Sequence, residues 1–98
     1  MSEHDPLELN RAVPGGRVEL FAVRTDDYPG GWFYRFQYYR PGNGEILRYD
    51  NAHDDTDLGW HHRHVRSGED SRLDFHGLVA HVTRFLHEVA EYTPTDNP

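Results

Sequence analysis

The chain has 98 residues and a mass of 11.5 kDa, from which we expect one domain with a single small core and no second domain. Seventeen acidic residues outnumber ten basic residues, all of them arginine, and the formal net charge of −7 indicates an acidic surface of the kind adapted to high salt. No cysteine is present, which excludes disulfides, thiol nucleophiles and cysteine-based zinc sites.

The first sixteen residues are predicted to form a loosely ordered lead-in, with a short helical turn around residues 7–11. The chain starts with acidic residues, whereas a signal peptide starts with a basic region followed by an apolar one, and no run of 18 apolar residues occurs. We therefore expect a soluble, cytoplasmic protein. The folded core is expected over residues 17–92, followed by a disordered tail at 93–98.

Three segments rich in β-forming residues follow the lead-in, at 17–24, 32–40 and 46–51. The turn at 40–45 contains proline and glycine, so the second and third strands are expected to pair antiparallel. Strand periodicity places four aromatic residues on one face of the second strand: Trp32, Tyr34, Phe36 and Tyr38. We interpret this aromatic row as core packed under a helix rather than as a base-stacking platform. Arg35 and Gln37 then point outward from the opposite face.

The remaining elements complete an α+β fold. Residues 52–59 are expected to form a polar loop, and residues 60–66 and 72–75 are expected to add a fourth and a fifth short strand. From His76 to Tyr92 the apolar residues recur three and four positions apart, which predicts a helix. The predicted fold is a twisted antiparallel sheet of three to five strands with one C-terminal helix packed across one face.

The chemically distinctive segment is His61-His62-Arg63-His64. On a strand, His62 and His64 project from one face about 7 Å apart, whereas His61 and Arg63 project from the other. This arrangement has three interpretations. The histidines could exchange protons with a phosphodiester, they could bind zinc or nickel together with Asp50 or His53, or they could simply cover a sheet edge.

Cleavage of RNA through its 2′-hydroxyl needs a base for that hydroxyl, an acid for the leaving 5′-oxygen and cations over the phosphate. Histidine fills either proton role, and the guanidinium of arginine fills the last. His62 and His64, with Arg63 or Arg48 and with Tyr49 to stack a base or donate a proton, supply every type of group required. The structural interpretation instead makes Asp50 and Asn51 a turn that caps the backbone.

A resemblance to a known family rests on the same segment. Tyr34-Arg35-Phe36, the glycine hairpin, Arg48-Tyr49-Asp50-Asn51 and then His61-His62-Arg63-His64-Val65 resemble the TumE-like toxins of toxin–antitoxin systems. The resemblance implies a toxin partnered by a DNA-binding antitoxin, often of helix-turn-helix type, with translation or RNA as the target. The matching positions are Tyr49, Asp50, Asn51, His62, Arg63 and His64, and more loosely Arg35.

Residues and resemblance together predict the toxin of a type II toxin–antitoxin pair that acts as a metal-independent ribonuclease without a cofactor. The expected catalytic residues are His62, His64, Asp50 and Arg63, and the expected substrate-binding residues are Arg35, Arg48, Tyr49, Asn51 and His61. Two alternatives stay open: a non-catalytic module that binds nucleic acid or protein, and a histidine metal-binding protein. The expected partners are the antitoxin and RNA but no membrane, and self-association is also compatible with the sequence.

Overall fold

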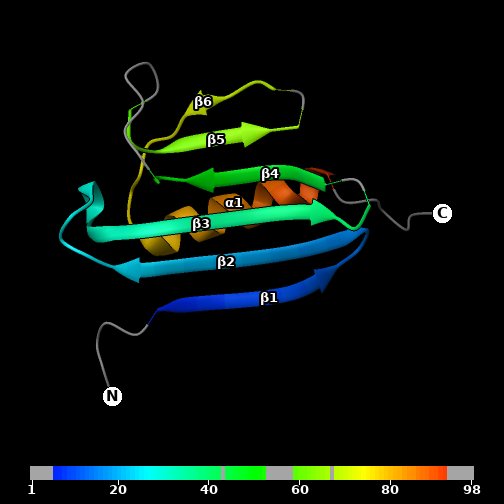
Figure 1. The fold of residues 1–98 in the computed structure, drawn as a ribbon, viewed down its shortest axis with the longest axis horizontal. Helices are drawn as coiled ribbons and strands as arrows, with labels where there is room; N and C mark the ends of the chain where they lie inside the picture. Colours follow the sequence, from blue (N-terminus) through cyan, green and yellow to red (C-terminus); the bar gives the residue numbers. More distant parts are fainter. Residues whose placement is uncertain (1–5, 43, 53–58, 67, 93–98) are drawn as a thin grey trace.

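The computed structural model describes residues 6–42, 44–52, 59–66 and 68–92. It contains strands, a short 3₁₀ turn (Pro29–Gly31) and one helix (Figure 1). The strands are β1 (Leu7–Val13), β2 (Gly16–Arg24), β3 (Trp32–Arg40), β4 (Gly44–Asp50), β5 (His62–Val65) and β6 (Ser71–Arg72), and the helix is α1 (Leu78–Tyr92).

The described strands form one antiparallel sheet in the order β1-β2-β3-β4-β5-β6, so each strand pairs with its neighbours in sequence. Helix α1 lies across one face of this sheet (Figure 1). The predicted α+β fold with a C-terminal helix is confirmed. The predicted number of three to five strands is wrong, because the sheet has six.

The additional strand is β1, which occupies residues expected in the loosely ordered lead-in with its helical turn. Leu7, Leu9 and Val13 of β1 are half-buried, whereas the other residues of this strand are exposed. All seven residues pair with β2 through an antiparallel ladder that closes at Val13 and Gly16. As an edge strand, β1 takes its order from hydrogen bonds to β2 rather than from a strongly apolar pattern of its own. The expected tail at 93–98 lies outside the described residues.

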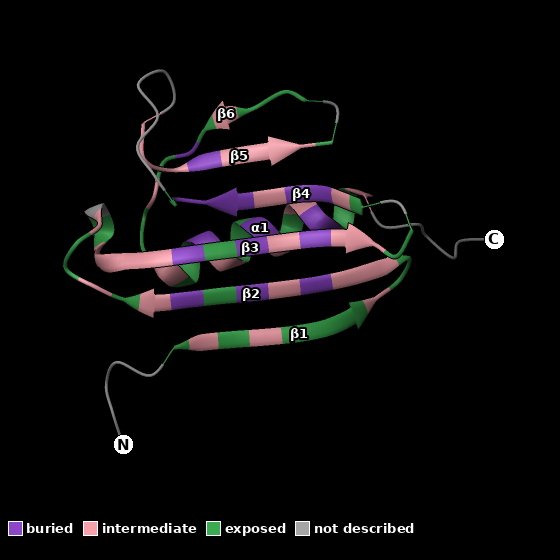
Figure 2. Cartoon of the chain, viewed as in Figure 1, coloured by how far each residue is buried: buried purple, intermediate pink, exposed green. Residues whose placement is uncertain are grey.

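The core lies between the sheet and α1, and burial alternates along the central strands (Figure 2). Tyr34, Phe36 and Tyr38 of β3 are fully buried, and Phe36 packs edge-on against Phe85 of α1 at 5.6 Å between ring centroids. Burial of one such aromatic side chain stabilises the fold by about 1.5–3 kcal/mol. The aromatic row is therefore core, as predicted, although Trp32 at its end is only half-buried.

A β-bulge fixes which side chains of β4 face away from α1. Tyr38 pairs with Leu47, but Tyr39 pairs with Glu45, so Ile46 is an extra residue on β4. Beyond the bulge, Leu47 and Tyr49 are buried toward the core. Arg48 and Asp50 therefore project from the opposite face of the sheet, called the open face below.

Candidate active site on the open face

Cross-strand pairs of β3, β4 and β5 place several polar side chains next to one another on the open face. The β4–β5 ladder pairs Asp50 with His62 and Arg48 with His64, and the β3–β4 ladder pairs Arg35 with Asp50. Directly opposite residues of an antiparallel pair lie close enough for their side chains to interact. The register thus brings together residues that the sequence separates by up to 29 positions.

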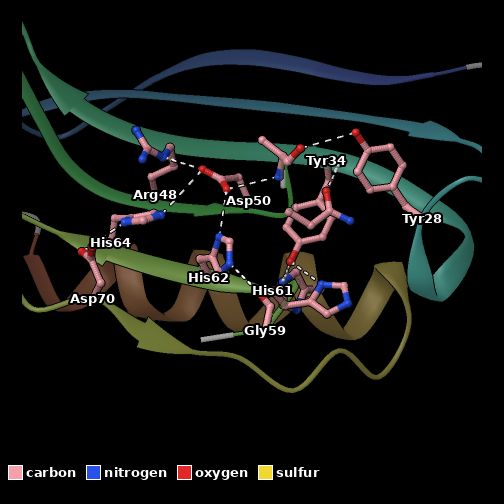
Figure 3. A network of polar contacts seen from close by, with 12 residues as sticks. Tyr28, Tyr34, Arg48, Asp50, Gly59, His61, His62, His64 and Asp70 are labelled. Carbon is pink, nitrogen blue, oxygen red and sulfur yellow. Dashed lines mark hydrogen bonds and ion pairs between the residues drawn. The ribbon is translucent and has the colours of Figure 1, made fainter. Parts of the chain in front are cut away.

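Asp50 lies beside both histidines of the neighbouring strand, and dashed lines join it to each of them in Figure 3. Asp50 Oδ1 is 3.6 Å from His62 Nδ1, and Asp50 Oδ2 is 4.0 Å from His64 Nε2. Both separations exceed the upper limit of about 3.2 Å for a good N–H···O hydrogen bond. The carboxylate and both imidazoles nevertheless share one face, and one ligand atom from each of the three lies within 4.8 Å of the others.

His62 is held in place from its outer edge. Its side chain is buried, and His62 Nε2 lies 2.5 Å from the carbonyl oxygen of Gly59. A carbonyl only accepts hydrogen bonds, so Nε2 carries a hydrogen, and Nδ1 is the ring nitrogen on the side of Asp50. Gly59 has φ of 77°, a left-handed conformation that glycine adopts without strain.

His64 has a partner that the sequence analysis missed, Asp70. His64 Nδ1 lies 3.0 Å from Asp70 Oδ1, which accepts the ring hydrogen and leaves the lone pair of the neutral ring on Nε2. The side chain of His64 is 24% exposed and that of His62 only 3%, so His64 is the histidine that a solute can reach. Asp70 directly precedes β6, and neither motif nor spacing in the sequence connects it with His64.

The two arginines of the open face differ in their partners. Arg48 Nη1 donates to Glu45 Oε1 at 3.0 Å, and Arg48 Nε lies 2.6 Å from Asp50 Oδ2 without the alignment of a hydrogen bond. Arg35 is exposed and makes no hydrogen bond or ion pair with any residue that the structure describes. Arg35 is therefore better able than Arg48 to contact an anion.

A pocket of about 250 Å³ opens at this cluster. Its lining comprises Phe33, Tyr34, Arg35, Arg48, Asp50, Ala52 and His64. A larger groove of about 700 Å³ adjoins it, because Phe33 and Arg35 line both hollows, and Phe21 lies in that groove. The site therefore combines a reachable imidazole, a carboxylate and a guanidinium beside exposed aromatic surface, the groups that proton transfer on a phosphodiester requires.

Arg63 and Tyr49 lie on the other side of the sheet, facing α1. Arg63 forms an ion pair with Glu88, and Tyr49 Oη donates to Glu88 Oε1 at 2.5 Å. The hydrogen bond to Glu88 raises the pKa of Arg63, and burial together with that carboxylate raises the pKa of Tyr49. Burial raises the pKa of Glu88, but the hydrogen bonds from Arg63 and Tyr49 outweigh it and hold the pKa below its usual value. The structure does not bring Arg63 or Tyr49 to His62 and His64.

His61 also faces α1 and belongs to a buried chain of polar groups. Tyr34 Oη lies 2.9 Å from His61 Nδ1 and 2.8 Å from His81 Nε2, so the hydroxyl donates to one ring and accepts from the other. Burial lowers the pKa of His81 to about 3, and burial followed by the charge of His62 lowers the pKa of His61. Burial also raises the pKa of Tyr34. This chain is neutral and satisfies polar groups inside the core.

Asn51 joins the end of β4 to the start of β3. Its Oδ1 accepts from the backbone N–H of Tyr34 at 3.0 Å, and its Nδ2 donates to the carbonyl of Trp32 at 2.7 Å. Asn51 is fully buried, and its side chain has backbone partners at both ends. Its position therefore fixes the corner next to Asp50 and offers no group to the pocket.

Comparisons with known proteins bear on the family. Searches of curated proteins and of solved structures give no significant match. Among the described residues, no helix has the length and apolar character needed to cross a membrane. The family model described as Toxin TumE matches residues 7–93, which span every described strand and the helix. The chain belongs to the TumE toxin family and is a toxin of a toxin–antitoxin system with a cognate antitoxin as its partner.

Proposed function

We propose that this toxin is a metal-independent ribonuclease of a type II system and that its active site is the open-face cluster of Asp50, His62 and His64. The observation that carries the proposal is the orientation of His64. Its Nδ1 is paired with Asp70, and its Nε2 faces the pocket beside Asp50. A histidine whose other nitrogen donates to a carboxylate is oriented as a general base.

In this mechanism, His64 Nε2 takes the proton of a ribose 2′-hydroxyl, and the 2′-oxygen attacks the adjacent phosphorus. The bond from phosphorus to the 5′-oxygen breaks, leaving a 2′,3′-cyclic phosphate on one product. The departing 5′-oxygen takes a proton from the Asp50–His62 pair, which enters the reaction with a second proton on His62, at Nδ1 beside Asp50. His62 is buried, so its proton reaches the substrate through the carboxyl group of Asp50, which lines the pocket. His62 and His64 thus divide the acid and base roles.

Arg35 is the principal phosphate contact in this proposal. It is exposed next to Asp50, and among the described residues it has no competing ion pair. Arg48 contributes less, since Glu45 and Asp50 already share its guanidinium. Arg63 is excluded from this step because its guanidinium is bound to Glu88 on the opposite face.

A second candidate is a module that binds RNA or the antitoxin without breaking a bond. The groove beside the site favours it, because Phe21 and Phe33 offer aromatic surface next to Arg35. Base–aromatic stacking contributes about 1–3 kcal/mol per base to single-strand binding. In both candidates we expect the antitoxin to be a helix-turn-helix DNA-binding protein encoded beside the toxin.

The two candidates are separated by incubating antitoxin-free protein with single-stranded RNA in the presence and absence of a chelator. Cleavage that persists with the chelator, yields 2′,3′-cyclic ends and is lost in His64→Ala supports the ribonuclease. His87→Ala is the matched control, because His87 is an exposed histidine on α1. An RNA with 2′-deoxyribose at the cleaved position should stay intact. RNA that is bound but uncleaved under every condition would support the second candidate.

A further inference from the structure

We propose that Asp50, His62 and His64 also form a binding site for a divalent transition-metal ion, with Zn²⁺ as the best fit, and that the bound ion inhibits the toxin. The site itself is argued from geometry alone, whereas the inhibition rests on the proposed function. The three residues come from adjacent strands, and their potential ligand atoms converge from β4 and β5 on one point of the open face (Figure 3).

The spacing of the ligand atoms is close to that of a zinc site. Zn²⁺ binds nitrogen and oxygen at about 2.0–2.2 Å, which in tetrahedral geometry separates the ligand atoms by about 3.4 Å. Asp50 Oδ1 and His62 Nδ1 are 3.6 Å apart, and Asp50 Oδ2 and His64 Nε2 are 4.0 Å apart. All three ligand atoms lie within 4.8 Å of one another. For tetrahedral coordination, the most widely separated ligand atoms have to approach one another by no more than about 1.4 Å.

The hydrogen bonds at the outer edges of both rings resemble those that support metal-binding histidines. His62 Nε2 donates to the carbonyl of Gly59, and His64 Nδ1 donates to the carboxylate of Asp70. Histidines that bind metals almost always donate their other N–H to a backbone carbonyl or a carboxylate, which fixes the tautomer and orients the ring. Here both kinds of support occur, one for each ring, and His62 Nδ1 and His64 Nε2 are the ring nitrogens on the side of Asp50.

The charge around the cluster also favours a cation. Two arginines and three carboxylates surround the histidines, which leaves one net negative charge when both rings are neutral; these residues are Arg35, Arg48, Glu45, Asp50 and Asp70. A divalent ion bound among these side chains adds positive charge next to Asp50 and Asp70, whose carboxylates both lie close to His64.

The set of donors selects the class of metal. Two imidazole nitrogens and one carboxylate oxygen suit Zn²⁺ and its neighbours, whereas Mg²⁺ and Ca²⁺ prefer oxygen ligands only. His62 and Asp50 are buried, and His64 borders the pocket of about 250 Å³, so a fourth ligand can enter from that side. An ion in this position occupies the lone pair of His64 Nε2, which the proposed reaction needs as its base.

The binding test uses the full chain, freed of metal and of antitoxin. Zn²⁺ is titrated by calorimetry and Co²⁺ by its visible absorption, with thermal unfolding measured at each concentration. We expect one ion per chain, a higher unfolding temperature with Zn²⁺, and affinity at least tenfold weaker in His64→Gln but unchanged in His87→Gln. Asp70→Asn provides a second variant at an exposed position and should weaken binding by about 10–100-fold.

The result that overturns the site is the absence of saturable Zn²⁺ or Co²⁺ binding up to millimolar concentration. Equal affinity in His64→Gln, Asp70→Asn and His87→Gln would also overturn it. The RNA assay is scored separately. Zn²⁺ bound at His64 while RNA stays intact in every condition supports the site and overturns the proposed function. Cleavage that requires Zn²⁺ supports the site and overturns both the inhibition and the metal-independent mechanism.

Discussion

Asp50 and His62 face each other across the β4–β5 ladder, with Asp50 Oδ1 3.6 Å from His62 Nδ1, while the carbonyl of Gly59 contacts the other nitrogen of the ring. The contact arises because the bulge at Ile46 turns Asp50 away from the core and the antiparallel register places His62 opposite it. Backbone geometry, rather than a flexible loop, therefore positions this pair beside the more exposed His64.

Replacement of Asn51 tests the proposal that this residue builds the corner beside the site. Asn51→Ala leaves the N–H of Tyr34 and the carbonyl of Trp32 without their side-chain partner in a buried position. The free energy of unfolding should fall by about 2–3 kcal/mol, as measured in urea. Asn10→Ala, which removes only solvent-exposed hydrogen bonds from Arg17, is the control and should change it by less than about 0.5 kcal/mol. Equal values for the two variants would contradict the structural role of Asn51.

Arg63 faces α1 and not the pocket, so its replacement should change the stability of the fold but not RNA cleavage. Arg63→Met removes the ion-pair partner of a half-buried Glu88 and should lower the free energy of unfolding by about 1–3 kcal/mol. RNA cleavage per mole of folded protein should stay within about twofold of the wild type. Both quantities can be measured on one preparation at a temperature well below the unfolding midpoint. A large loss of cleavage by fully folded Arg63→Met would return Arg63 to the catalytic group.

The sequence made the fold largely predictable because the apolar pattern changes period at a clear point. The aromatic strand 32–40 alternates and the segment 76–92 repeats at helical spacing, so sheet and helix could both be assigned. Strand β1 escaped prediction, because Asn10, Arg11 and Ala12 interrupt its alternation and β2 supplies the order. Strand periodicity also separated His62 and His64 from His61 and Arg63 correctly. The contacts of Asp70 and Glu88 depend on where a turn and a helix lie in space, which local pattern does not encode.

Stability should depend on pH through His81. Its pKa is lowered to about 3 in the folded protein, whereas an unfolded histidine titrates near 6.5, so the unfolded chain binds more protons between these values. The contribution of neutral His81 to the free energy of unfolding is therefore fully present above about pH 6.5. It is lost as the pH drops toward 3, by up to about 1.4 kcal/mol per pH unit. Between pH 7.5 and pH 5 the free energy of unfolding should fall by about 2 kcal/mol through His81.

Urea unfolding of His81→Gln and His87→Gln at these two pH values isolates this contribution. His81→Gln should lose about 2 kcal/mol less stability on acidification than the wild type, because it removes the buried group that titrates. His87→Gln should follow the wild type, since His87 is exposed. An identical acid dependence in all three proteins would show that His81 is not held neutral by burial.

Arg35 should contribute to substrate binding more than to the chemical step. Arg35→Gln removes an exposed guanidinium from the edge of the pocket and should raise KM for RNA by about tenfold while changing kcat little. The dependence of KM on salt should weaken as well, because one phosphate contact is lost. Arg11→Gln, at an exposed position of β1, is the control. An unchanged KM in Arg35→Gln would remove Arg35 from the site.

The most direct test of the account is the rate of RNA cleavage by wild type and His64→Ala in the presence of a chelator, with the folded fraction of each protein measured by circular dichroism. If His64 is the general base, the folded variant should cleave about 10²–10⁴-fold more slowly than the wild type. Equal rates for the two proteins, or intact RNA with the wild-type toxin freed of its antitoxin, would contradict the account.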